Sequence, residues 1–395
     1  MSFASDATAA RRSRRAASMM FLVDGVGFGV WAALLPSLQR RLEIGDGDLS
    51  VILLLMAAGA MAAMGVVGRV VARCGSRTTL RWVAPMFCLA LCLPAVSRDF
   101  SAVAAAAILL GALKGCFDVT VNAQSIVVEK ALDRPVLSSF QAWWSFGGLG
   151  AAGLTGLALK LGAAPVQITL LVAAILLLLS LLCPRDLLHD VESVPSGRRV
   201  GPVFNPRLAL IGVLAFAALF AEGVMMDWSA IYAQRVAGAA DWLAPFAYGI
   251  FCTAMGVGRL SGDRLMSRFE PRMVVRCCGA LGAAGLLLMV LVPYLPATFV
   301  GLAAVGLGFA NLVPVFLGAA SRARPDAVAR AVASVSMIGY TGFLAGPPVV
   351  GLLSDFAGLP ATFGAVAVLA LAIGWWGPAL LERSPRKEEQ EAYNG

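Results

Sequence analysis

The feature that most constrains this chain is a series of apolar runs, each long enough to cross a lipid bilayer, separated by short polar breaks. A run of about 20 apolar residues spans the roughly 30 Å hydrocarbon core of a membrane. Only 14% of the 395 residues are charged and the mean hydropathy is +0.82, whereas about 25% charged residues are usual in soluble domains. We therefore predict a polytopic all-α membrane protein with twelve transmembrane helices. The predicted spans are 16–38, 49–72, 82–97, 100–122, 137–160, 166–183, 208–233, 242–261, 274–292, 297–320, 331–353 and 360–381.

The basic residues predict how these spans are oriented. Of the 31 Lys and Arg residues, 25 fall at the two ends of the chain and in every second break, and five fall in the opposite breaks. Cytoplasmic segments of membrane proteins are enriched in Lys and Arg. We therefore expect both termini in the cytoplasm of a bacterial inner membrane. The net charge of +8 is explained by this topology, so nucleic-acid binding is not expected.

The chain divides into two halves that repeat each other's motifs. Its longest polar interval, 184–207, separates residues 1–183 from residues 208–395. An acid followed by glycine occurs in the first span as Asp24-Gly25 and in the seventh as Glu222-Gly223. We expect two pseudo-symmetric six-helix bundles joined by a cytoplasmic loop, because repeats of this kind place a substrate site near the membrane midplane where the halves meet.

Two basic segments carry a resemblance to a known family. The segment GRVVARCGSRTTL, residues 68–80, resembles the loop between helices two and three of the major facilitator superfamily, although Ala72 replaces the usual aspartate. The related segment GRLSGDRLMSRFEPR, residues 258–272, keeps an aspartate. The resemblance implies a twelve-helix secondary transporter in which these loops clasp neighbouring helix ends at the cytoplasmic gate. The gating residues it implies are Arg73, Gly75, Arg77, Arg259, Asp263, Arg264 and Arg268.

Three further stretches narrow the resemblance. The segments DGVGFGVWAALLP, FDVTVNAQSIVVE and EGVMMDWSAIY resemble a bacterial branch of inner-membrane carriers that includes rhizopine-uptake-like proteins. This likeness does not fix a substrate.

Five ionisable residues lie inside the predicted spans, where charges are costly and usually functional. They are Asp24 in the first span, Lys114 and Asp118 in the fourth, and Glu222 and Asp227 in the seventh. The resemblance implies that these spans line a central cavity together with the tenth span. We predict a set of proton-coupling or substrate-binding residues: Asp24, Lys114, Asp118, Asn122, Glu222 and Asn311.

The charged residues of the fourth span follow a helical spacing. Lys114, Asp118 and Asn122 recur at every fourth residue and lie along one stripe. One interpretation is a proton or substrate site, and the alternative is an intrahelical ion pair between Lys114 and Asp118 that only stabilises packing. Asp227 lies about 140° around its helix from Glu222 and is expected to make a separate contact.

Aromatic and neutral polar residues are the candidate substrate contacts, namely Trp31, Gln141, Trp144, Trp228 and Tyr340. Trp143 and Trp144 are equally consistent with an interfacial anchor, because tryptophan is enriched at membrane surfaces.

No metal or cofactor is expected: the eight cysteines lack metal-ligand spacing, and the lone His189 lies in the central loop.

The predicted function is proton-coupled transport of a small solute by alternating access. Four intramembrane acids against one base favour a neutral polyol, a sugar-like solute or a cation. The alternative is proton-driven efflux of drugs or amphipathic metabolites. A nucleotide-binding GxxxxGK[ST] motif is absent, so ATP-driven transport is not predicted. The spans contain no histidine, metal cluster or nucleophile–base pair, so the chain is not expected to be an enzyme. The expected partners are the solute, protons and the lipid bilayer, and the expected oligomeric state is a monomer.

Overall fold

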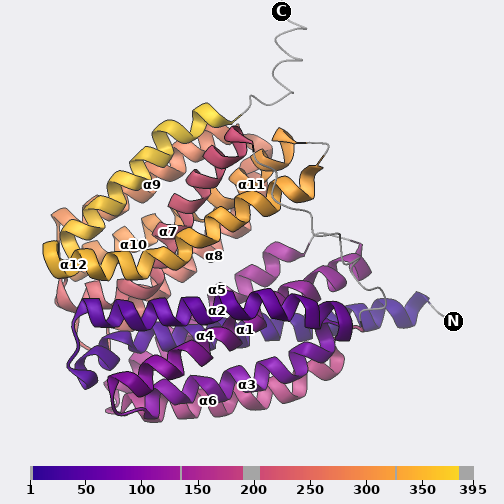
Figure 1. Cartoon of the computed structure of the whole chain (residues 1–395), viewed down its shortest axis with the longest axis horizontal. Helices are drawn as coiled ribbons and strands as arrows, with labels where there is room; N and C mark the ends of the chain where they lie inside the picture. Colours follow the sequence, from indigo (N-terminus) through magenta and orange to yellow (C-terminus); the bar gives the residue numbers. More distant parts are fainter. Residues whose placement is uncertain (1–2, 134–135, 190–204, 325–326, 382–395) are drawn as a thin grey trace, which may run out of the picture. The chain divides into compact units, whose positions relative to one another are not determined.

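The computed structural model describes residues 3–133, 136–189, 205–324 and 327–381, and all regular structure within these ranges is helical (Figure 1). The first half contains α1 (Phe3–Leu42), α2 (Asp46–Cys74), α3 (Ser76–Val96), α4 (Phe100–Leu132), α5 (Leu137–Lys160), α6 (Pro165–Leu182) and the 3₁₀ helix η1 (Cys183–Asp186). The second half contains α7 (Pro206–Arg235), α8 (Ala244–Arg268), α9 (Pro271–Leu291), α10 (Leu295–Phe309), α11 (Leu312–Ala323) and α12 (Val328–Leu380).

The twelve predicted spans all fall on helices. The tenth span falls on α10 and α11, which are interrupted at Ala310 and Asn311, and the last two fall on α12 on either side of Gly358, whose φ of 79° is not helical. Among the described residues, nine helical stretches are long and apolar enough to cross a membrane, with α10–α11 and α12 each counted once. Large apolar side chains such as Trp82, Phe356 and Trp375 are exposed, as expected for a surface solvated by lipid. The predicted fold class is confirmed.

The chain forms two compact units. The first comprises Met1–Arg198 and Ala239–Cys252, and the second comprises Arg199–Gly238 and Thr253–Gly395. The first part of α8 therefore packs with the first unit, and the rest of α8 packs with the second.

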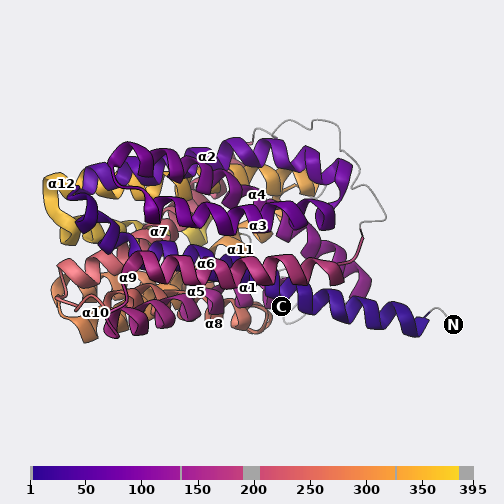
Figure 2. The ribbon, with the colours of Figure 1, turned by 90° about the horizontal axis from the view of Figure 1, so that it is seen from below.

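In the first unit, α1 packs along α5, α2 packs along α4, and α3 packs against both α4 and α6 (Figure 2). The close approach of α1 and α5 requires glycine. A Cβ atom built on Gly25 would lie 2.1 Å from the carbonyl oxygen of Trp144, and one on Gly147 would lie 2.8 Å from that of Leu22. Since real Cβ atoms do not approach so closely, only glycine lets the two backbones meet here.

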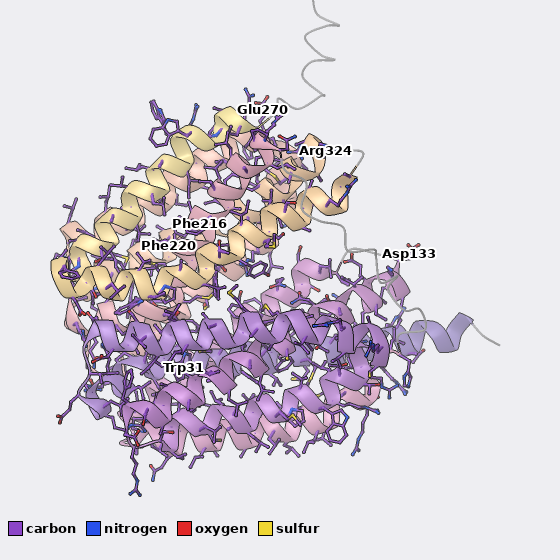
Figure 3. The ribbon with its side chains drawn as sticks, in the orientation of Figure 1. Trp31, Asp133, Phe216, Phe220, Glu270 and Arg324 are labelled. Carbon is purple, nitrogen blue, oxygen red and sulfur yellow. The ribbon has the colours of Figure 1, made fainter. Side chains whose placement is uncertain are left out.

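The second unit repeats this pairing. Helix α7 packs along α12, and α9 packs against α12 and α10. A Cβ atom on Gly223 would lie 2.8 Å from the carbonyl oxygen of Phe343, and one on Gly342 would lie 2.2 Å from that of Phe216. Phe216 and Phe220 stack one turn apart on α7 with ring centroids 6.1 Å apart (Figure 3). The acid-glycine motif of each half thus lies at a close contact between that half's first helix and its fifth span.

Candidate functional site

The ammonium group of Lys114 joins two carboxylates from different helices. Its Nζ atom lies 3.2 Å from Asp24 Oδ2 on α1 and 2.5 Å from Asp118 Oδ1 one turn along α4. The indole Nε1 of Trp144, on α5, donates a 2.9 Å hydrogen bond to the same Asp24 oxygen. Three helices of the first unit therefore meet at these four residues, which we call the Lys114 cluster.

The Lys114 cluster has a buried end and an open end. The side chains of Asp24 and Lys114 are 1% and 11% exposed, whereas that of Asp118 is 32% exposed. Asp24 Oδ1 is buried and has no hydrogen-bond partner among the described residues. Lys114 is thus held between an enclosed carboxylate and a carboxylate that is open to its surroundings.

Aromatic rings flank the Lys114 ammonium. Its Nζ atom lies 5.6 Å from the ring centroid of Phe28 and 5.9 Å from that of Trp144, within the range of a cation–π interaction. Phe28 was not among the predicted site residues, although it lies one helical turn after Asp24 and therefore on the same face. This four-residue spacing from Asp24 could have identified Phe28 as a site residue from the sequence.

Two amide side chains extend the cluster from its open end. Asn122 Nδ2 donates a 2.8 Å hydrogen bond to the backbone oxygen of Asp118, and Gln141 Nε2 lies 3.3 Å from Asn122 Oδ1. Asn122 is exposed and Gln141 is half-buried. The stripe predicted from the four-residue spacing therefore lies along one face of α4, and it contains both the intrahelical Lys114–Asp118 pair and an interhelical pair to Asp24.

The second unit contains a separate buried ion pair. Arg259 Nη2 on α8 donates a 2.8 Å hydrogen bond to Glu222 Oε1 on α7, and the Glu222 side chain is only 6% exposed. The resemblance implied that Arg259 is a gating residue. It lies within α8, near the end of the predicted span 242–261, and that helix continues beyond its apolar part to Arg268, shortly before Pro271 begins α9. Arg259 is therefore a second base, besides Lys114, set against the four predicted intramembrane acids.

The other predicted residues of the second unit make separate contacts. Asn311 occupies the position before the first residue of α11 without a side-chain capping bond, and its Nδ2 atom donates a 3.0 Å hydrogen bond to the backbone oxygen of Gly258. Asp227 and Trp228 are buried, and within the described residues Asp227 Oδ1 and Trp228 Nε1 have no hydrogen-bond partner. Tyr340 on α12 is 57% exposed.

The first predicted gating segment forms a tight turn. Gly75 alone separates α2 from α3 and has a φ of 80°, a conformation that favours glycine. Arg73 lies in the last turn of α2, and Arg77 Nη2 in the first turn of α3 donates a 2.7 Å hydrogen bond to the backbone oxygen of Arg185. In the second segment, Arg264 and Arg268 are exposed on α8, whereas the side chain of Asp263 lies outside what the structure describes.

Trp31 is not among the residues that make the contacts of the Lys114 cluster. It is buried in the first unit (Figure 3), where it lines an apolar cavity of about 200 Å³ together with residues of α3 and α6 such as Leu91 and Thr169. Its Nε1 atom has no partner among the described residues.

Two helical bundles with ionisable side chains in their interiors define a multi-pass membrane transporter. The model of the Major Facilitator Superfamily matches residues 16–323 and 262–394, and the chain belongs to this superfamily. It is accordingly a secondary transporter with a small-molecule substrate.

Proteins of similar sequence cover almost the whole chain. An uncharacterized MFS-type transporter of Yersinia pestis is 33% identical over 359 residues, which is 90% of this chain and 92% of that protein. An uncharacterized transporter of Sinorhizobium fredii is 33% identical over 91% of this chain and 96% of its own length. The membrane protein MosC of Rhizobium meliloti is 30% identical over 91% of this chain and 87% of its own length.

Solved structures show the same fold at low identity. The nucleoside transporter NupG matches with a TM-score of 0.74 at 13% identity, covering 93% of this chain and 99% of its own. The xylose transporter XylE of E. coli, in a partially occluded inward-open conformation, matches with a TM-score of 0.71 at 12% identity, covering 96% and 99% of the two chains.

Proposed function

We propose that this chain couples the movement of a small neutral polyol, sugar-like or cationic solute to protons, and that the Lys114 cluster carries the coupling. The observation that supports this role is the sharing of one buried ammonium group between Asp24 on α1 and Asp118 on α4. Ionisable groups inside a membrane are costly, and they mark proton and substrate pathways.

The charge of the cluster supports the uptake of one proton. Two carboxylates and one ammonium group leave one net negative charge in a largely buried place. Burying an uncompensated charge is unfavourable. The cluster therefore favours the binding of one proton, because that proton makes its net charge zero. The unpartnered Oδ1 atom of Asp24 offers a place for this proton. The more exposed carboxylate of Asp118 offers a route to it.

Protonation would change how α1 is attached to α4. When Asp24 is neutral, Lys114 keeps its full ion pair only with Asp118, which lies on its own helix. The ion pair between the two helices then weakens. A proton can shift the equilibrium between conformations only by as much as its affinity differs between them. A conformation in which Lys114 and Asp24 are apart binds that proton more tightly than one in which they are paired.

The open end of the cluster fits a polar solute. Asn122 and Gln141 offer amide donors and acceptors beside the Asp118 carboxylate, and Trp143 is 44% exposed nearby in sequence. Four acids against two bases disfavour a strongly anionic solute. The fold neighbours include proteins named as transporters of nucleosides and xylose and a fucose:proton symporter, which accords with a hydroxyl-bearing solute.

The topology and gate that we propose follow the distribution of basic residues. Both termini and the loop at 184–207 face the cytoplasm of the inner membrane, and the halves 1–183 and 208–395 move as bundles of a monomer. Arg73, Gly75 and Arg77, together with the basic end of α8, form the cytoplasmic gate.

The experiment begins with a thermal-shift screen of the purified protein against sugars, cyclitols, amino acids and drugs at two pH values. The solute found is then used in proteoliposomes with an imposed pH gradient. We expect Asp24→Asn to abolish gradient-driven accumulation while sparing solute exchange, because the amide cannot cycle a proton. The matched control Asp48→Asn changes an exposed acid at the start of α2 and is expected to accumulate normally. Undiminished pH-driven accumulation in Asp24→Asn would refute the coupling role.

A further inference from the structure

A second cavity in the first unit shares no lining residue with the Lys114 cluster, and its lining is mainly basic in charge. It has a volume of about 550 Å³ and lies where α1 and α3 begin and α6 ends. Its lining includes Arg12 of α1, Arg77 of α3, and Arg185, Asp186 and His189 from the segment that follows α6.

Hydrogen bonds from three helices fix one wall of this cavity. Arg77 Nη2 donates to the backbone oxygen of Arg185 at 2.7 Å, and the backbone nitrogen of Leu188 donates to Ser13 Oγ on α1 at 3.0 Å. Gln124 Nε2 on α4 donates to the backbone oxygen of Leu188 at 3.2 Å. Residues 185–188 are therefore fixed against α1, α3 and α4, and this wall of the cavity is an ordered part of the fold.

Among the described residues, the basic side chains that line the cavity outnumber the acidic ones. Three guanidinium groups face one carboxylate, that of Asp186. Within the described residues, neither the Arg12 nor the Arg185 side chain has a hydrogen bond or an ion pair, and Arg77 Nε is buried without an acceptor. A buried N–H group without an acceptor is costly. An anion that enters the cavity therefore meets N–H donors that have no acceptor among the described residues.

We propose that this cavity binds the phosphate group of an anionic ligand. Guanidinium groups present paired N–H donors that match phosphate oxygens in a bidentate manner. The cavity lies at the end of the bundle that carries the basic segments, which we place at the cytoplasmic membrane surface. Basic pockets between helices on that side bind anionic lipid headgroups. A phospholipid headgroup and a soluble phosphate share this chemistry, and the experiment separates them.

The test measures ligand binding to the full-length protein in a neutral detergent. Phosphatidylglycerol is titrated against phosphatidylcholine of the same acyl chains, and inorganic phosphate is titrated against chloride at equal ionic strength. Binding is followed by native mass spectrometry and by the unfolding midpoint. The variant Arg12→Gln/Arg185→Gln removes two unpaired cations, and the matched control Arg11→Gln/Arg276→Gln removes two exposed arginines outside the cavity.

We expect wild type and the control to bind one of the two phosphate sources and the cavity variant to bind it about 30-fold more weakly, from about one kcal/mol per arginine. Binding of phosphatidylglycerol alone assigns the site to a lipid headgroup, and binding of inorganic phosphate assigns it to a soluble anion. The proposal is overturned if neither source binds in preference to its control, or if both double variants lose affinity equally.

Discussion

Removal of the shared base should be the most damaging single change in the Lys114 cluster. In Lys114→Gln, the carboxylates of Asp24 and Asp118 face each other without a cation. At the 3.2 Å separation between Lys114 Nζ and Asp24 Oδ2, the Coulomb attraction is about 5 kcal/mol for an effective dielectric constant of about 20. Since breaking a buried pair typically costs about 3–5 kcal/mol, we expect a loss of that size in the free energy of unfolding.

The double variant Lys114→Gln/Asp24→Asn should recover much of that loss. In this variant the buried acid is replaced by a neutral amide, and only the partly exposed Asp118 keeps a charge. Asp24→Asn alone should cost less than Lys114→Gln, because Lys114 retains Asp118. Chemical denaturation in detergent measures all three, with Lys130→Gln at the exposed end of α4 as the matched control. Additive effects of the two substitutions would refute the shared-base arrangement, because contacting residues that form one ion pair must couple.

Two further predictions concern the helix contacts of each unit. Gly25→Ala should destabilise the protein by about 3 kcal/mol, because its new methyl group meets the Trp144 carbonyl, whereas Gly153→Ala, with nothing within 4 Å, should stabilise it by up to about 1 kcal/mol. Equal denaturation midpoints for these variants would count against the close contact. Arg259→Gln should cost about 3 kcal/mol by leaving Glu222 without a cation, the low end for a buried pair because the Arg259 side chain is 22% exposed. If adding Glu222→Gln restores none of that stability, the ion pair is not what stabilises α7 on α8.

Much of the fold was predictable because the bilayer imposes a length and a composition on every span. The predicted runs 49–72 and 137–160 match α2 and α5 within a few residues. The boundary of α8 was less predictable. Hydropathy reports where a helix leaves the apolar layer, whereas the helix itself continues until its backbone is broken, here near Pro271. The resemblance made Arg259 a gating residue, and no local pattern predicted its ion pair with Glu222.

The sequence by itself determined that charged residues lie inside the spans and that Lys114, Asp118 and Asn122 share one face of α4, because a four-residue spacing fixes position on a helix. Only the tertiary structure decided which partners they meet. Asp24 is 90 residues from Lys114 and 120 residues from Trp144 in the chain. Their contact depends on the glycine-mediated approach of α1 to α5, and no local pattern encodes such a distance. The repeated acid-glycine motif predicted two pseudo-symmetric halves. Only the packing of the helices determines that Asp24 pairs with Lys114 and that Glu222 pairs with Arg259.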